Sequence, residues 1–158
     1  MKKILLSSLL FLGFSGVSEA QIDAGTMIAG GSAYFNHYRS STVKSTSLMV
    51  SPQFGLAFAD NFIAGAQVNI YSVVSTSNWK VSPFVRYYAK NAFLQLRYGY
   101  SRISGSGQST LGADLGYAIF VNKNVAIEPA FYYERYLSDP TGANLGMKIG
   151  LQFYFNRK

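Results

Sequence analysis

Apolar and polar residues alternate along most of the chain, and this period of two constrains the fold more than any other feature. From Leu48 to Phe58 the even positions carry large apolar residues or proline, whereas the odd positions are mostly small or polar. Successive side chains of a β-strand point to opposite faces, so this segment reads as a strand with two different faces. The pattern recurs at 62–71, 79–88, 94–101, 111–121, 125–134 and 146–155, and a less regular first strand is expected near Met27 to His37. The sequence therefore predicts an all-β fold of eight strands.

The predicted connections alternate in length, which indicates how the strands are joined. Tight turns are expected at Asp60-Asn61, Lys90-Asn91 and Asn122-Lys123-Asn124. Longer polar loops are expected over 38–45, 75–77, 104–108 and 138–143. Short turns at one end and longer loops at the other are typical of an antiparallel up-and-down barrel with both termini at the turn end. Three prolines fall inside predicted strands, where we expect bulges or strand ends: Pro52, Pro83 and Pro129.

The first 20 residues have the organisation of a secretory signal peptide. Lys2 and Lys3 precede an apolar run over residues 4–14, and small residues lead to Ala20, after which cleavage is expected. The run has 11 residues, whereas a membrane-spanning helix needs roughly 20. We therefore divide the chain into a signal peptide, residues 1–20, and one barrel domain, residues 21–158. Export of this kind predicts a protein of a bacterial cell envelope.

The composition excludes several classes of site. The chain has no cysteine and one histidine, His37, so we expect no disulfide, no thiolate nucleophile and no histidine-rich metal centre. No phosphate-binding glycine loop or nucleic-acid motif is present, and no cofactor is expected. Without the signal peptide, 12 basic residues stand against 6 acidic ones. This excess is suited to lipid phosphates, although solubility and ion pairing inside the fold are the simpler explanation.

The size of the apolar face decides between a membrane barrel and a soluble one. A soluble, lipocalin-like barrel buries its apolar residues in the lumen, and the apolar sets of this chain are too large for eight strands to enclose. In a membrane the apolar face contacts lipid, and a closed barrel pairs every backbone amide internally, so the arrangement is favourable there. Aromatic residues also fall at two levels along the strands, as at the two membrane interfaces. They are Phe58, Phe62, Tyr87, Phe153 and Phe155 near the short turns, and Phe35, Tyr38, Trp79, Tyr100 and Tyr136 near the longer loops. We predict an eight-stranded antiparallel up-and-down transmembrane β-barrel in the outer membrane, and keep a lipocalin-like ligand binder as the alternative.

The other face of the predicted strands carries charged residues of both signs. An eight-stranded barrel has an interior that side chains just fill, so these charges are expected to pair rather than line a wide channel. Simple hairpin register predicts that Arg97 meets Asp114 and that Lys148 meets Glu134. A narrow ion path is the functional alternative. The predicted lumen set comprises Lys80, Arg86, Arg97 and Lys148 with Asp114, Glu128 and Glu134.

The last strand carries a motif that resembles the terminal signal of outer-membrane barrels. It consists of Lys148, Gly150, Phe153 and Phe155, in the order polar, x, Gly, x, x, aromatic, x, aromatic. In those proteins the barrel-assembly machinery reads this signal, so the resemblance implies that machinery and periplasmic chaperones as partners during biogenesis. With the alternating strands, the whole mature chain resembles small outer-membrane barrels of the OmpX or OmpW-like superfamily. Three residues follow Phe155, where many family members end.

Three roles for the outer rim follow from these predictions. The first is a structural or surface-interaction role of a monomer that contacts membrane lipids and lipopolysaccharide. Its candidate lipopolysaccharide contacts are Arg39, Lys44, Lys80, Arg102 and Arg135. The second is a lipid A-modifying enzyme, as some small barrels are, with the candidates His37, Ser40, Ser41, Ser138 and Asp139. No motif connects these five residues, so we expect no catalysis and name no catalytic residue. The third is adhesion to a protein, for which the predicted loops offer little area.

Overall fold

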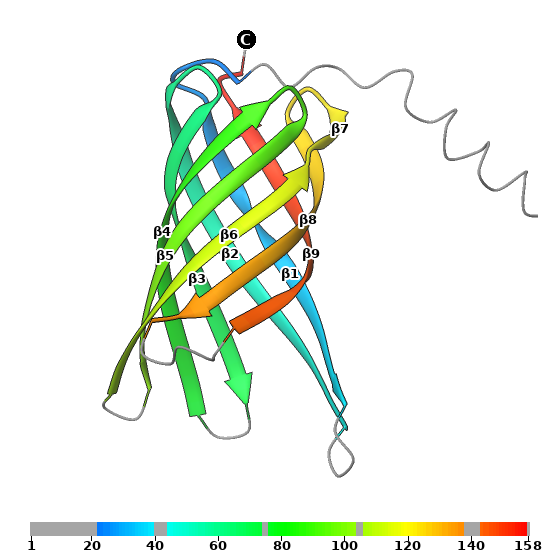
Figure 1. Ribbon diagram of the computed structural model, residues 1–158. Coiled ribbons are helices and arrows are strands. Elements are labelled where there is room, and N and C mark those ends of the chain that lie inside the picture. The colour runs from blue at the N-terminus through cyan, green and yellow to red at the C-terminus, as the bar shows by residue number, and fades with distance from the viewer. Residues whose placement is uncertain (1–21, 40–43, 74–75, 104–105, 138–142, 158) are drawn as a thin grey trace, which may run out of the picture.

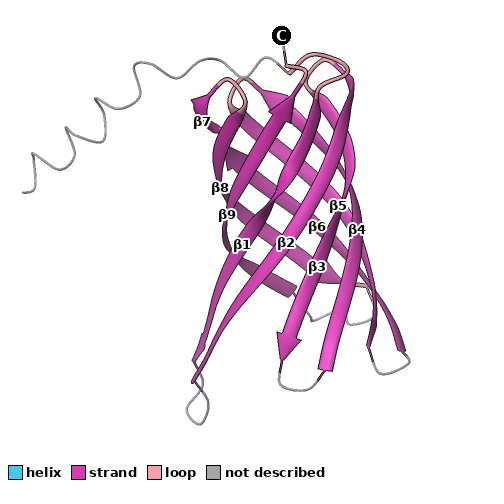
Figure 2. Ribbon diagram, turned by 180° about the vertical axis from the view of Figure 1, so that it is seen from behind, coloured by secondary structure: helices cyan, strands magenta, loops and turns pink. Residues whose placement is uncertain are grey.

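All regular elements in the described part of the chain are antiparallel β-strands that close into a barrel (Figures 1 and 2). The computed structural model describes residues 22–39, 44–73, 76–103, 106–137 and 143–157. Within these ranges no helix is long and apolar enough to cross a membrane. The strands are β1 (Met27–Arg39), β2 (Lys44–Ala59), β3 (Phe62–Val73), β4 (Thr76–Ala89), β5 (Ala92–Ile103), β6 (Ser106–Tyr117), β7 (Ile119–Asn122), β8 (Val125–Tyr136) and β9 (Ala143–Phe155).

The barrel closes through two pairings, one between the first and last strands and one between two strands that β7 separates in the chain. β1 pairs with β9, and β6 pairs with β8. β7 also pairs with β8, so β6 and β7 occupy one position in the wall at successive levels. The nine segments therefore form an eight-stranded up-and-down barrel, as the alternation predicts. The C-terminus lies at the same end as the short turns (Figure 1).

The strand predicted over 111–121 is longer than expected and is interrupted at Ala118. It begins at Ser106, and the Ala118 amide donates a hydrogen bond to the Asn91 carbonyl at 2.7 Å. The Ala118 side chain is fully buried. β5 begins at Ala92, directly after the turn at Asn91, and pairs there with Tyr117. The chain beyond Ala118 therefore extends past the end of β5. β7 continues there by pairing with β8.

The tight turns form where predicted, and the strands extend further into the predicted loops than expected. Turns at Asp60-Asn61 and Lys90-Asn91 join β2 to β3 and β4 to β5. The third turn is narrower than predicted, since Asn122 belongs to β7. At the other end β1 and β2 extend well inside the predicted loop over 38–45, and β6 begins inside the one over 104–108. Longer hairpins satisfy more backbone amides, which accounts for the difference.

The prediction of bulges or strand ends at the three prolines is wrong. The register passes through each of them without a shift on one side: Gly31 faces Pro52, Ala66 faces Pro83 and Pro129 faces Ile149. On the other side the pairing skips or stops at the proline. Proline lacks the amide hydrogen that a ladder needs, so a one-sided gap accommodates it. The prolines therefore lie within continuous strands.

Candidate functional site

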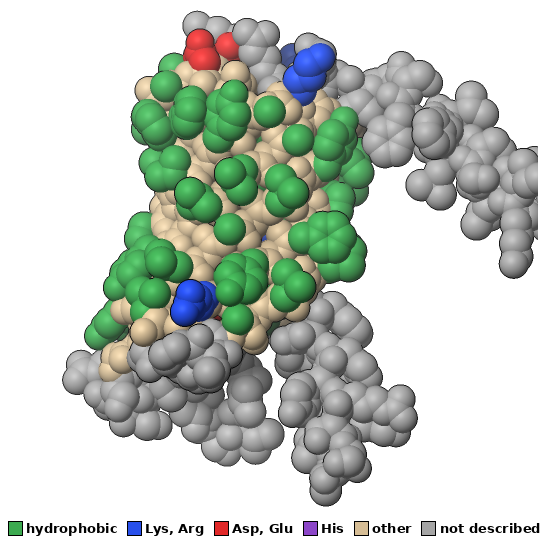
Figure 3. Space-filling view, in the orientation of Figure 1, with side chains coloured by type: hydrophobic (Ala, Val, Ile, Leu, Met, Phe, Trp, Pro, Cys, Tyr) green, Lys and Arg blue, Asp and Glu red, His purple; other side chains and the backbone are tan. Residues whose placement is uncertain are grey.

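The outward face of the barrel is apolar over its whole circumference. Large hydrophobic side chains are exposed on every strand of the described wall except β1, whose described outward positions carry the half-exposed Met27 and small residues. Figure 3 shows the exposed side chains spread over one side between the two ends. Leu96, Phe131 and Ile149 are 56%, 59% and 62% exposed. A water-soluble monomer rarely exposes a continuous apolar surface of this size. The inward positions of the same strands are buried and mostly polar.

Aromatic side chains gather near the end that carries the tight turns. Phe62 contacts both Phe58 and Tyr87, with ring centroids 6.0 Å and 4.6 Å apart. Phe153 and Phe155 are exposed on β9 at the same end. At the opposite end Trp79 and Tyr100 are exposed and Tyr136 is half-buried. The side chains of Phe35 and Tyr38, predicted for that second level, lie outside the described residues.

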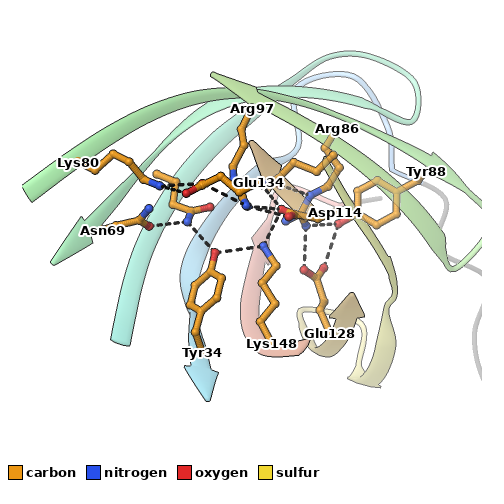
Figure 4. Close-up of polar contacts among 12 residues, drawn as sticks. Tyr34, Asn69, Lys80, Arg86, Tyr88, Arg97, Asp114, Glu128, Glu134 and Lys148 are labelled. Carbon is orange, nitrogen blue, oxygen red and sulfur yellow. Dashed lines mark hydrogen bonds and ion pairs between the residues drawn. The ribbon is translucent and has the colours of Figure 1, made fainter. Parts of the chain in front are cut away.

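Inside the barrel, one group of charges lies nearer the tight turns, and we call it the turn-side cluster (Figure 4). Arg86 of β4 places Nη1 2.8 Å from Oε2 of Glu128 on β8. Two tyrosine hydroxyls donate to the other carboxylate oxygen, Tyr88 at 3.0 Å and Tyr154 at 2.6 Å. Arg86 Nε donates to Gln95 Oε1 at 2.8 Å, and the guanidinium lies 4.4 Å from the Phe93 ring centroid. One cation and one anion are thus enclosed and hydrogen-bonded.

A second group lies nearer the opposite end, and we call it the mouth-side cluster: Lys80, Arg97, Asp114, Glu134 and Lys148 (Figure 4). Asp114 is bridged by two cations, with Arg97 Nη1 and Lys148 Nζ each 2.7 Å from one carboxylate oxygen. Glu134 binds Lys80 Nζ at 2.7 Å and lies 3.5 Å from Arg97 Nη2. Three cations therefore face two anions, and all five residues are buried.

The two clusters are connected, and together with apolar residues they fill the lumen. Gln95 Nε2 donates to Asp114 Oδ2 at 3.1 Å, while its oxygen accepts from Arg86. At the turn end the lumen is closed by an apolar layer that includes Ile22, Ile28 and Ile63, each fully buried. At the mouth-side cluster a cavity of about 80 Å³ remains. That is room for two or three waters at about 30 Å³ each.

The structure contains the predicted contact between Arg97 and Asp114 but not the one between Lys148 and Glu134. Lys148 lies opposite Ala130 on β8, whereas Glu134 lies opposite Asn144. Ala130 has a small side chain, so Lys148 reaches over it toward Asp114 on β6. The prediction assumed simple hairpin register, whereas the small side chains of a barrel wall allow contacts across a strand.

Lys80 was predicted both for the lumen and for lipopolysaccharide contact, and only the first placement is correct. Its side chain is 4% exposed and its ammonium group binds Glu134. A lysine at an inward position near a rim gains more from a buried carboxylate than from reaching around the wall. Of the other predicted contacts, Arg135 is exposed on β8. The side chains of Arg39, Lys44 and Arg102 lie outside the described residues.

Glycine makes room for the mouth-side cluster at one position on β6. A Cβ on Gly112 would lie 2.6 Å from Arg97 Nε, so the guanidinium group needs this glycine. Gly112 is also the register neighbour of both Arg97 and Glu134. Because Gly112 has no side chain, Arg97 can extend across β6 toward Glu134. Sequence reasoning assigned Gly112 to the inward face but not this role.

Several lumen residues were not recognised from the sequence. Tyr88 and Tyr154 occupy inward positions of the alternation, which is the signal that the sequence offers for them. Gln95 had the same signal. Ile22 precedes the first strand and carried no pattern, although its amide donates to Asn61 Oδ1 at 3.3 Å and its carbonyl accepts from the Asn61 amide at 2.7 Å. Local turn contacts hold it in the lumen.

The remaining predicted sites are partly outside the described part of the chain. This holds for the cleavage site after Ala20, for Ser40, Ser41, Ser138 and Asp139, and for the side chain of His37. Within the described ranges no group of three or more His, Cys, Asp or Glu side chains could hold a metal ion. The four residues of the terminal motif all lie on β9, with Lys148 and Gly150 buried in the lumen and Phe153 and Phe155 on the outward face.

Comparison with known proteins supports the fold through structure rather than sequence. No protein-family model and no curated protein sequence matches the chain. The crystal structure of Neisserial surface protein A (NspA) is similar, with a TM-score of 0.54 and 16% sequence identity. The similarity covers 84% of this chain and 98% of that chain. The chain therefore has the fold of a small eight-stranded outer-membrane barrel.

Proposed function

We propose that this chain is an integral protein of a bacterial outer membrane, exported with residues 1–20 as a cleaved signal peptide. The observation that carries the proposal is the reversal of the usual polarity: apolar side chains cover the outside, and charged pairs fill the inside. A lipocalin-like protein would need the opposite arrangement. With the tight turns and the C-terminus in the periplasm, the opposite end faces the cell exterior.

The proposed role is structural or surface-interacting, through contacts with membrane lipids and lipopolysaccharide, and non-catalytic. Ion pairs and the apolar layer at the turn end occupy the lumen, which argues against a conducting role. The similarity to NspA, described by its name as a surface protein, is consistent with this role. A closer relation to the OmpX or OmpW-like superfamily, and recognition of β9 by the barrel-assembly machinery, belong to the same proposal.

Electrophoresis of membrane fractions, with and without boiling, tests the proposal. A folded membrane barrel resists detergent, so the unboiled protein should migrate differently from the boiled one and should be recovered with the outer membrane. Mass spectrometry of the mature protein should find Gln21 at the N-terminus. Identical migration together with recovery in the soluble periplasm would contradict the proposal and favour the lipocalin-like alternative.

Conductance in planar lipid bilayers separates the filled barrel from the narrow channel. The wild-type barrel should add no steady open-channel current, because side chains close the lumen. A large open-lumen porin of known conductance, inserted under the same conditions, is the positive control. A steady current of the folded wild-type protein would contradict the closed lumen and support the channel.

A further inference from the structure

The outward wall of β4, β5, β6 and β8 contains an open groove of about 720 Å³. Ala113 lies at its floor, opposite Leu96 on one side and Tyr133 on the other. Leu96 and Tyr133 are large and about half exposed, so the alanine between them leaves a depression. Val85 and Leu111 add further apolar walls. The groove has the apolar lining that suits a lipid acyl chain.

Among the described residues that line this groove, one exposed cation lies at its outer end. Arg135 lines the groove and stands opposite Leu111 in the register of β6 and β8. It is next to the last residue of β8, on the side away from the tight turns. An arginine on the lipid-facing wall of a barrel is costly at the bilayer midplane and is tolerated near the interface, where charged headgroups lie. This position therefore favours an anionic partner.

Carboxylates within the described strands do not supply that partner. All three of them, Asp114, Glu128 and Glu134, are buried in the lumen and bound to other cations. Asp23 and Asp60 lie at the opposite end of the barrel, with the tight turns. A guanidinium group binds a phosphate through two parallel hydrogen bonds, which makes phosphate a suitable ligand for Arg135.

A second groove on the opposite part of the wall provides a natural comparison. It also measures about 720 Å³ and is formed by β1, β2, β8 and β9. Gly31 and Ala33 form part of it, between Val50 and Ile149, and no charged residue lines it. Both grooves can accept acyl chains, but this one has no group to hold a charged headgroup.

We propose that the groove ending at Arg135 is a selective seat for lipid A, the acylated and phosphorylated sugar lipid of the outer leaflet. One acyl chain lies over Ala113, and a sugar phosphate binds Arg135. The argument rests on the proposed function, because the groove meets lipid only if the barrel spans the membrane. The position of Arg135 at the outer-leaflet end of the wall favours lipid A over a phospholipid.

Native mass spectrometry of the refolded mature barrel, released from detergent micelles, tests the seat. Wild-type protein should retain one bisphosphorylated lipid A, and it should bind phosphate-free lipid A and phosphatidylglycerol at least about tenfold more weakly. Arg135→Gln should weaken lipid A binding about tenfold, equivalent to about 1.4 kcal/mol. Arg135→Lys should lie between the two, because it keeps the charge and loses the paired hydrogen bonds.

Matched variants in the two grooves test the acyl-chain contact. Ala113→Phe fills the floor of the proposed seat and should weaken lipid A binding, whereas Ala33→Phe in the second groove should leave it unchanged. Ala113→Leu is the milder variant if the phenylalanine prevents folding. Equal effects in both grooves, no effect of Arg135→Gln, or phosphatidylglycerol bound as tightly as lipid A would each overturn the seat. Heat-dependent migration of every variant shows that the variant is folded. With that control met, any of these three outcomes overturns the lipid A seat and leaves the proposed membrane location intact. A wild-type barrel without heat-dependent migration would refute the membrane location itself.

Discussion

The two charged clusters of the lumen contain similar residues but solve the burial of charge differently. The turn-side cluster pairs one cation with one anion, and two tyrosine hydroxyls complete the carboxylate's hydrogen bonds. The mouth-side cluster holds three cations on two anions beside a cavity of about 80 Å³. Removing either member of a balanced, enclosed pair leaves a buried charge without its partner. A cluster with a surplus cation near water can lose one cation and stay balanced. This contrast predicts which substitutions unfold the barrel and which it tolerates.

The largest loss is expected when the anion of the turn-side cluster is removed. Glu128→Gln leaves the Arg86 guanidinium, 1% exposed, without its countercharge. Removing one partner of a buried ion pair costs about 3–5 kcal/mol, so the free energy of unfolding should fall by that amount. Urea unfolding of the refolded barrel in lipid vesicles, followed by heat-dependent migration, measures it. The double variant Arg86→Met, Glu128→Leu should be less destabilised than the single one, and a single-variant loss below about 1 kcal/mol would show that the pair is not enclosed.

A smaller loss is expected for the shared anion of the mouth-side cluster. Asp114→Asn leaves Arg97 and Lys148 facing one another, yet Arg97 keeps Glu134 at 3.5 Å and the cavity admits water. We expect a loss of about 2–3 kcal/mol in the same unfolding assay, because part of the charge is still compensated. Lys148→Met in the Asp114→Asn background should recover much of it. Failure of that rescue would contradict repulsion as the cause.

The surplus cation itself should be nearly dispensable. Lys148→Met alone leaves Lys80 and Arg97 with Asp114 and Glu134, two charges of each sign, and its own stem is replaced by an apolar chain of similar length. The expected change in unfolding free energy is within about 1 kcal/mol, whereas Arg86→Met should cost about 3–5 kcal/mol. Urea midpoints of the two variants, compared in the same vesicles, give the difference. Equal losses would remove the distinction between the clusters.

The sequence predicts the wall of this barrel better than its contents. Side-chain alternation has a fixed period, so it assigns nearly every strand residue to the correct face, including Arg86, Glu128 and Lys148. Which charges meet depends on register between strands and on gaps left by small side chains such as Ala130, and neither is visible in the local pattern. Lys148 was therefore placed in the lumen correctly and given the wrong partner. Ile22 escaped prediction because it lies outside any strand.

The smallest effect is expected in the coupling between the two clusters, which Gln95 links. Gln95 accepts from Arg86 at 2.8 Å and donates to Asp114 at 3.1 Å, so it is the described side chain that bonds to both. Gln95→Leu keeps a similar volume but removes both hydrogen bonds, each worth about 1 kcal/mol at most to charged groups that retain other partners. We expect a total loss of about 1–2 kcal/mol, measured by urea unfolding.

A double-mutant cycle of Glu128→Gln with Asp114→Asn should show coupling of about 0.5 kcal/mol or more in the wild-type background. The same cycle in the Gln95→Leu background should approach additivity. Coupling that survives the substitution would mean that the clusters interact through their charges across the lumen rather than through this side chain.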